Sequence, residues 1–294
     1  MALFQGSGVA IVTPFNPDFT INFDALGELI EFHIANHTDA IIICGTTGEA
    51  ATLTDEEQIE CVRYTVEKVA GRIPVIAGAG SNHTDHCISL ALGCQNAGAD
   101  GLLLVTPYYN KTTQKGLIAH YSAVANAVDI PIILYHIPGR TGVTIQPETF
   151  RELVKLPHVV GIKEACGNIS AIAKTAHLCP GIDLYSGDDD QILPIMSLGG
   201  IGVISVFANI CPQQCHDLCM AYLEGDTARA TQMQLDALPL MNALFNEVNP
   251  IPVKAALRLM GFNVGHCKLP LVDPEPQHLE ELRQAMIDYG VLPR

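Results

Sequence analysis

The feature that most constrains the fold of this chain is a repeated alternation of short apolar runs with longer helix-like segments. Eight runs rich in β-branched residues can be counted, and successive runs are far enough apart for a strand, a helix and two loops. Eight such units are what a closed barrel of parallel strands requires. The predicted strands are residues 9–13, 40–44, 74–77, 101–106, 131–136, 159–163, 183–186 and 202–206.

The segments between these runs have the pattern of helices. One of them opens with a capping box, because Thr54 can accept a hydrogen bond from the first turn while Glu57 reaches back to the backbone. The predicted helices are residues 23–36, 54–70, 84–97, 114–127, 147–156, 170–179, 190–198 and 212–223. We therefore predict an α/β fold, a (β/α)8 TIM barrel that spans residues 1–224 and is the catalytic domain.

The alternation stops after about residue 225, and the remaining chain has a helical pattern. Breaks are expected near Asn249-Pro250 and Pro270, because proline cannot donate the backbone hydrogen bond that a continuing helix needs. We predict that residues 225–294 form a C-terminal helical region packed on the barrel.

The formal net charge of −15, from 31 Asp and Glu against 16 Lys and Arg, argues against a partner that presents phosphates. Nucleic-acid binding needs a basic stripe, which this composition does not favour. No run of 18 apolar residues occurs, and no basic segment precedes the short apolar stretch near residue 10. We expect no membrane span and a cytoplasmic location.

The ten cysteines include no C-x-x-C pair, and several lie among apolar or small residues, as buried free thiols do. Cys211, Cys215 and Cys219 recur every four residues beside His216 and would share one helical face. Packing is the favoured explanation, because structural zinc sites more often use closely spaced pairs on turns. We predict no metal.

Polar and charged side chains follow five of the predicted strands, at the carboxyl ends where barrel enzymes carry their chemistry. Lys163 is the most informative, because it ends the apolar run Val159-Val160-Gly161-Ile162. Desolvation there would favour the neutral amine, a nucleophile for a carbonyl carbon. The alternative is a lysine that pairs with Glu164 or Asp188, or one that extends to solvent.

Tyr135 ends the neighbouring strand and could transfer protons, and Thr46 or Thr47 could relay them. Each of these residues alone is also typical of a core or turn position. Gly45 and Gly48 flank the threonines and allow backbone N–H groups to approach a carboxylate closely, which is the interpretation we favour.

Arg140 follows Pro138-Gly139 in a loop, and its planar guanidinium suits a carboxylate, although alone it would be an ordinary surface charge. Tyr108 and Tyr109 are typical of an interface as much as of a catalytic site. Both interpretations hold if a second subunit completes the site.

Together these motifs resemble one family, the pyruvate-dependent class I aldolases of the dihydrodipicolinate synthase and N-acetylneuraminate lyase type. Thr46-Thr47 and the Arg140 loop are similar to the dihydrodipicolinate synthase branch, since sialic acid lyases typically carry other residues at these places. The motifs that carry the resemblance are Gly45-Thr46-Thr47-Gly48-Glu49, Val105-Thr106-Pro107-Tyr108-Tyr109-Asn110, Tyr135 with Pro138, Gly161-Ile162-Lys163-Glu164, Ser186-Gly187-Asp188-Asp189 and Gly202-Val203-Ile204-Ser205.

The resemblance implies that pyruvate condenses with L-aspartate 4-semialdehyde in a homotetramer, a dimer of dimers, without a cofactor. Lys163 would hold pyruvate as an imine. The implied proton relay is Tyr135, Thr46 and Tyr109, with Tyr109 donated by a neighbouring subunit. The implied substrate-binding residues are Thr47 and the backbone at Ile204 for pyruvate, Arg140 for the semialdehyde carboxylate, and Gly187 and Asp188.

Some members of this family are inhibited by lysine in a cleft between subunits. The positions that would line the cleft here are Ala50, Ala51, Asp55, Gln58, Asn82, His86 and Tyr108. His86 replaces the glutamate that would bind the effector ammonium, and Gln58 replaces a common histidine, so we expect weak or absent inhibition. His136 stands where asparagine is common, and the sequence does not predict what this difference does.

Three other functions remain open. The same scaffold could act on a sugar acid or a hydroxy-oxoglutarate, although Arg140 argues against sugar substrates. A non-catalytic barrel could bind a keto acid, although the combination of Lys163, Tyr135 and Thr46 argues against it. A phosphate-handling isomerase would need a glycine-rich phosphate loop after the last two strands, where this chain is acidic.

Overall fold

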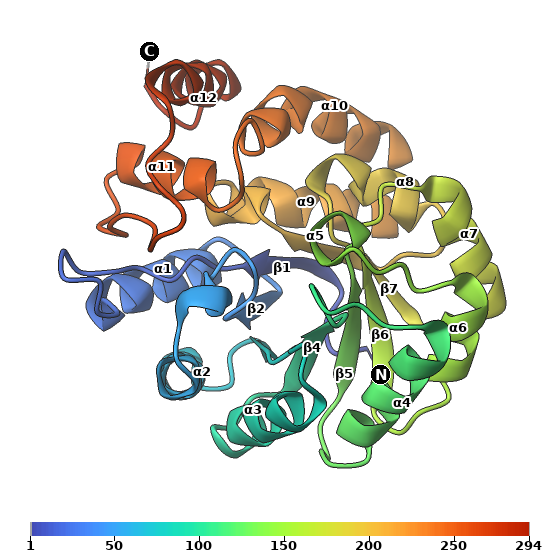
Figure 1. Cartoon of the computed structure of the whole chain (residues 1–294). Helices are drawn as coiled ribbons and strands as arrows, with labels where there is room; N and C mark the ends of the chain where they lie inside the picture. The colour runs from blue at the N-terminus through green and yellow to red at the C-terminus, as the bar shows by residue number, and fades with distance from the viewer. Residues whose placement is uncertain (1, 294) are drawn as a thin grey trace.

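The computed structural model describes residues 2–293, and eight parallel strands form a closed barrel in chain order (Figure 1). The last strand pairs with the first, with Gly6 opposite Gly202. The predicted barrel is therefore confirmed. The strands are β1 Gly6–Ala10, β2 Ala40–Ile43, β3 Val75–Gly78, β4 Gly101–Val105, β5 Ile132–His136, β6 Val159–Glu164, β7 Asp183–Ser186 and β8 Gly202–Ser205.

Strand boundaries differ from the predicted ones by a few residues at most. The largest difference is at β1, which begins at Gly6 and not at residue 9. Gly6 and Gly8 give no apolar signal, yet both face crowded positions: a Cβ at Gly8 would lie 2.6 Å from the Ile42 side chain. Close packing, not apolar character, selects these residues.

A ring of helices surrounds the barrel (Figure 1). Thr54 and Glu57 form the predicted capping box at the start of α2. The short helix α5, Pro138–Thr141, occupies what was predicted as a loop, and Pro138 at its first turn is already constrained to a helical φ. The others are α1 Phe23–Ala35, α2 Asp55–Val69, α3 Thr84–Asn96, α4 Gln114–Ala125, α6 Pro147–Leu153, α7 Ile169–Leu178, α8 Ile192–Met196 and α9 Pro212–Leu223, with 3-10 turns η1 Ala50–Thr52, η2 Asp189–Gln191 and η3 Phe207–Asn209.

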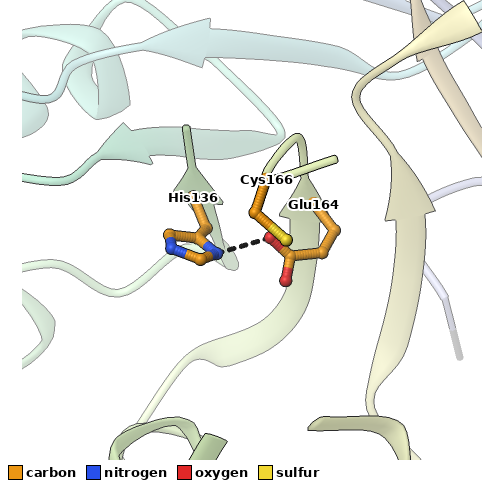
Figure 2. Close-up of side chains that lie close together, drawn as sticks. All are labelled: His136, Glu164 and Cys166. Carbon is orange, nitrogen blue, oxygen red and sulfur yellow. Dashed lines mark hydrogen bonds and ion pairs between the residues drawn. The ribbon is translucent and has the colours of Figure 1, made fainter. Parts of the chain in front are cut away.

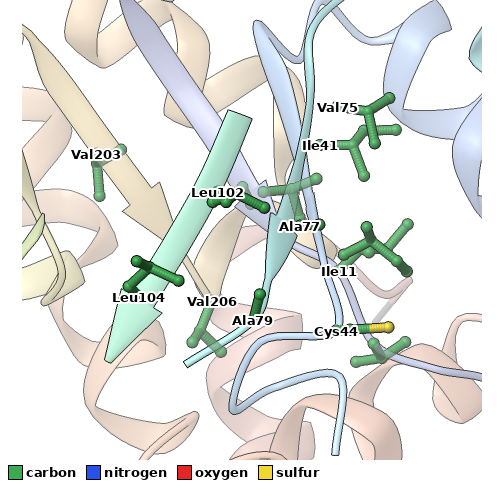
Figure 3. Packing of buried hydrophobic residues seen from close by; sticks show 14 of the residues in the cluster. Ile11, Ile41, Cys44, Val75, Ala77, Ala79, Leu102, Leu104, Val203 and Val206 are labelled. Carbon is green, nitrogen blue, oxygen red and sulfur yellow. The ribbon is translucent and has the colours of Figure 1, made fainter. Parts of the chain in front are cut away.

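Alternation along each strand divides the buried side chains into two clusters. On β4, Leu102 and Leu104 belong to the layer between strands and helices (Figure 3), whereas Leu103 packs inside the barrel. Tyr135 and Tyr185 belong to the inner cluster, with Tyr185 stacked on Phe4 at 4.5 Å between ring centroids. The inner cluster thus fills the barrel and forms the floor below its carboxyl-terminal end.

Three helices follow the barrel units: α10 Thr227–Ala243, α11 Ile251–Leu259 and α12 Pro276–Tyr289. α10 packs against α9 and α12, and α11 against α12 (Figure 1). The expected breaks near residues 249–250 and 270 fall between these helices, while the division of the chain at residue 224 stays a prediction. Within residues 2–293, no helix combines the length and apolar character needed to cross a membrane.

Candidate active site

Lys163 and Tyr135 lie side by side at the ends of β6 and β5, where they are register partners. Lys163 Nζ lies over the tyrosine ring, 4.2 Å from its centroid, and both side chains are 6% exposed. Burial lowers the pKa of Lys163 to about 8, although the nearby carboxylates of Asp188 and Asp189 oppose the shift. At pH 7 about a tenth of the Lys163 amine is then neutral, far more than for an ordinary exposed lysine.

Tyr135 keeps its proton, because burial raises the pKa of its phenol well above the ordinary value. Asp188 raises it further, whereas Arg140 and a hydrogen bond with Thr46 lower it. Thr46, in the loop after β2, lines the same pocket as the phenol and is near enough to affect its pKa, which suits it to relay the phenol proton. The phenol can donate this proton and then recover it.

Seven of the predicted site residues line one pocket at the carboxyl ends of the strands: Thr46, Thr47, Tyr135, Arg140, Lys163, Gly187 and Asp188. Ile204 faces the barrel interior on β8 and is not among the lining residues. The pocket contains two basic side chains, Arg140 and Lys163, and one acidic side chain, Asp188. Such a pocket suits a substrate that carries charges of both signs.

Asn249 is a pocket residue that sequence reasoning treated only as part of a helix break. Its side-chain Nδ2 donates to Thr47 Oγ1 at 3.0 Å, and its carbonyl oxygen accepts from Arg140 Nη2 at 3.2 Å. Asn249 is 5% exposed and comes from the C-terminal region, as does Phe245, which also lines the pocket. No local pattern signals this contact, which joins positions about 200 residues apart.

A second residue of the C-terminal region holds the loop that carries the threonines. Lys254 on α11 donates three hydrogen bonds, to Glu49 Oε1 at 2.9 Å, the Thr13 carbonyl at 3.1 Å and the His266 carbonyl at 2.9 Å. The other oxygen of Glu49 accepts from the backbone N–H of Lys268 at 2.8 Å. The motif residue Glu49 thus anchors the C-terminal region to the Thr46-Thr47 loop.

His136 and Glu164 form a buried pair at the ends of β5 and β6 (Figure 2). Each directly follows Tyr135 or Lys163 in its strand, so its side chain points to the opposite face of the strand. His136 Nδ1 lies 2.5 Å from Glu164 Oε1, while its Nε2 lies 3.1 Å from the backbone nitrogen of Ile145. Since the Ile145 N–H donates to Nε2, the ring proton is on Nδ1 and is donated to Glu164. The pair braces the two strands that carry the reactive side chains.

Cys166 lies beside this pair, and the three side chains are close enough to be considered as metal ligands. Two features disfavour that role. Metal at His136 Nδ1 would put the ring proton on Nε2, facing the N–H of Ile145. Burial also raises the pKa of the Cys166 thiol to about 11, which disfavours the thiolate ligand. Cys211, Cys215 and Cys219 lie in the apolar core, as the packing interpretation predicts.

A larger cleft of about 780 Å³ is continuous with the site and shares several lining residues with it, including Thr46, Tyr135 and Arg140. Tyr109 lines this cleft, is 91% exposed and has a φ of 68°. Six of the predicted effector-cleft residues line it as well, namely Ala50, Ala51, Asp55, Gln58, His86 and Tyr108. The seventh, Asn82, donates to the Tyr108 carbonyl at 3.1 Å.

The model of the Dihydrodipicolinate synthetase family matches residues 3–288 of this chain. The chain belongs to this family. A curated relative from Thermoanaerobacter sp. strain X514, named 4-hydroxy-tetrahydrodipicolinate synthase, is 58% identical over 294 residues, which cover 99% of each chain.

Solved structures of dihydrodipicolinate synthases have the same fold. The enzyme from Thermotoga maritima superposes with a TM-score of 0.97 at 42% identity and covers 99% of this chain and 100% of its own. The enzyme from Acinetobacter baumannii, solved in complex with pyruvate, has a TM-score of 0.96 at 43% identity, with 98% and 99% covered. The resemblance seen in the sequence motifs is therefore confirmed at the level of the family.

Proposed function

We propose that this chain is a lyase that acts as a 4-hydroxy-tetrahydrodipicolinate synthase, condensing pyruvate with L-aspartate 4-semialdehyde on the route to diaminopimelate and lysine. The observation that carries the proposal is the buried amine of Lys163 beside the Tyr135 phenol. The names of the curated relatives support the same reaction.

The neutral Lys163 amine attacks the keto carbon of pyruvate to give a carbinolamine. Tyr135 supplies the proton that lets hydroxide leave as water, and Thr46 relays protons to and from the phenol. The resulting imine loses a methyl proton to become an enamine, whose carbon attacks the aldehyde of the second substrate. Attack of that substrate's amine on the imine then closes the ring and frees Lys163.

Two parts of the pocket are suited to the two carboxylates. Thr47, with its oxygen already accepting a hydrogen bond from Asn249, can donate its own hydroxyl proton to the pyruvate carboxylate. The backbone of Gly45, which lines the pocket, completes that subsite, whereas Ile204 packs inside the barrel. Arg140 binds the carboxylate of the semialdehyde with its planar guanidinium. This chemistry needs no cofactor.

Tyr109 joins the proton relay only if it is supplied by another copy of the chain, because it is almost fully exposed in a single copy. We propose a homotetramer, a dimer of dimers, in which each site receives this tyrosine from its neighbour. We also propose a cytoplasmic location, which the ten free cysteines of this chain support.

Borohydride reduction in the presence of pyruvate tests the imine directly. Peptide mass mapping should find the reduced adduct on Lys163 and none on Lys254, the other buried lysine, which serves as an internal control. An adduct on another lysine contradicts the assigned nucleophile, and no adduct at all favours a non-catalytic keto-acid binder. Comparing L-aspartate 4-semialdehyde with sugar-acid substrates in a coupled assay then tests the acceptor.

A further inference from the structure

His136 joins three parts of the chain through its imidazole ring, although its side chain does not line the pocket. Its Nδ1 donates to Glu164 Oε1 on β6 (Figure 2), while its Nε2 accepts the backbone N–H of Ile145 at 3.1 Å. Ile145 lies nine residues further along the chain, just before α6. The ring therefore connects β5 and β6 to the segment that precedes α6.

The backbone N–H of Ile145 depends on this imidazole. Ile145 is 1% exposed and its side chain lies in the apolar core, so the N–H cannot turn to water without loss of that packing. Within residues 2–293, no other group accepts a hydrogen bond from it. Because a buried N–H without an acceptor is destabilising, the place of Ile145 is set by His136.

The segment between His136 and Ile145 carries Arg140 and is internally bonded. The N–H groups of Arg140 and Thr141 both donate to the Ile137 carbonyl at 3.1 Å. The N–H of Gly142 donates to the Pro138 carbonyl at 2.9 Å and closes the short helix α5. One end of this segment continues β5 and the other is held at Ile145, so these two ends fix the backbone from which the Arg140 side chain enters the pocket.

Other contacts of this segment do not replace the imidazole. Arg140 Nη2 donates to the Asn249 carbonyl at 3.2 Å, but this contact is made by the side chain and not by the backbone. The Gln114 side chain bonds to the backbone of both neighbours of Ile145, at 2.8 and 2.9 Å, where the groups are exposed and water competes for them. His136 supplies the buried anchor.

We propose that His136 is a positioning residue for Arg140: by accepting the Ile145 N–H, it fixes the segment 137–145 so that the guanidinium meets the carboxylate of the second substrate. The inference rests on the proposed function, in which Arg140 binds that carboxylate. The effect of His136 through this bond falls on binding of the aldehyde and not on formation of the imine at Lys163.

The two ring nitrogens can be separated by substitution. Asparagine places its amide near the position of Nδ1 and can still donate to Glu164, but none of its atoms reaches the position of Nε2. Glutamine is one methylene longer, and its amide oxygen can accept the N–H of Ile145. His136→Asn therefore releases the segment, whereas His136→Gln keeps it attached.

The test compares these two variants of the full-length chain with His120→Asn. His120 is a matched control because it is also buried, bonds to Thr84 Oγ1 at 3.0 Å and lies outside the pocket. Amide hydrogen exchange at Ile145 measures the anchor directly. Exchange of the pyruvate methyl protons in D₂O, followed by NMR, measures imine and enamine formation. Steady-state kinetics give kcat and KM for L-aspartate 4-semialdehyde.

In His136→Asn, we expect amide exchange at Ile145 to accelerate and KM for the aldehyde to rise, each about tenfold, while kcat and methyl exchange stay within about twofold. His136→Gln should bring both quantities back to within about threefold of the unmodified chain, because the bond to the N–H is restored. His120→Asn should leave both unchanged. In an Arg140→Met background, His136→Asn should raise KM no further.

Four results would overturn the inference: an unchanged KM in His136→Asn, an Ile145 amide that stays protected there, no recovery in His136→Gln, or additive effects with Arg140→Met. Loss of methyl exchange in His136→Asn would also overturn it, since His136 would then act through Tyr135 and Lys163. Absence of methyl exchange in the unmodified chain would instead overturn the proposed function.

Discussion

Two buried lysines, one at the barrel mouth and one in the C-terminal region, have similar surroundings at first sight. Lys163 is 6% exposed and Lys254 0%, and each ammonium nitrogen lies over an aromatic ring, at 4.2 Å from Tyr135 and 4.3 Å from Phe15. They differ in their partners. Lys254 donates all three of its protons to acceptors, whereas Lys163 has no hydrogen-bond partner within residues 2–293.

This difference separates a reactive amine from a structural cation. Burial lowers the pKa of both lysines. At Lys254 the adjacent Glu49 carboxylate opposes the shift, and three donated bonds require the ammonium form. At Lys163 the pKa falls to about 8, and the nitrogen lone pair can face a substrate. Burial alone therefore does not make a lysine a nucleophile, since the absence of acceptors is also needed.

The largest expected effect is on catalysis in Lys163→Met. Activity should fall by roughly 10³-fold or more, because the variant cannot form the imine. Its free energy of unfolding should equal or exceed that of the unmodified chain, since a desolvated amine is replaced by an apolar side chain of similar length. Urea denaturation measures the second quantity, and marked destabilisation would show that Lys163 also has a structural role.

Lys254→Met should give the opposite result. It leaves the buried Glu49 carboxylate without its partner, so the free energy of unfolding should fall by about 3–5 kcal/mol. The double variant Lys254→Met with Glu49→Met removes both charges and should recover part of this loss. If the single variant is as stable as the unmodified chain, the ion pair does not hold the two regions together.

Sequence patterns predicted that Lys163 lies at the barrel mouth but did not predict that Lys254 is buried. Lys163 and Tyr135 end apolar strands, so their convergence at one barrel mouth follows from the strand count and the direction of parallel strands. Lys254 lies in an amphipathic helix, where a lysine normally faces water. Its partner Glu49 is 205 residues away, and no local periodicity encodes such a pairing.

Substitution of Asn249 should have the next largest effect, because this residue connects the C-terminal region to Thr47, the residue proposed to bind the pyruvate carboxylate. In Asn249→Asp a carboxylate replaces the amide donor, so the Thr47 hydroxyl must turn its proton toward residue 249 and away from pyruvate. KM for pyruvate should rise by about 10- to 100-fold. Asn246→Asp is the matched control, since Asn246 donates to the His278 carbonyl outside the pocket.

A Thr47→Val background separates this mechanism from a general loss of structure. In this background residue 47 has no hydroxyl proton that an aspartate at position 249 could redirect. The effects of the two substitutions on KM for pyruvate should therefore be far from additive. Additive effects on KM would contradict the role of Asn249 as a positioning residue for Thr47.

The smallest expected effect is inhibition by free lysine. The surroundings of Lys254 show which acceptors a buried ammonium needs. Lys254 has a carboxylate and two carbonyls around its nitrogen. In the cleft the Asp55 carboxylate is already engaged by His86 Nε2, at 2.8 and 2.9 Å from its two oxygens, and His86 Nδ1 lies 3.0 Å from Ser81 Oγ. An incoming ammonium would have to displace the imidazole. We therefore predict no inhibition at about 1 mM lysine, a concentration at which even a weakly bound effector would act.

His86→Glu adds a carboxylate at this place, and a titration that shows new inhibition in this variant alone would support the explanation. Submillimolar inhibition of the unmodified chain would show that the cleft binds ammonium through other groups.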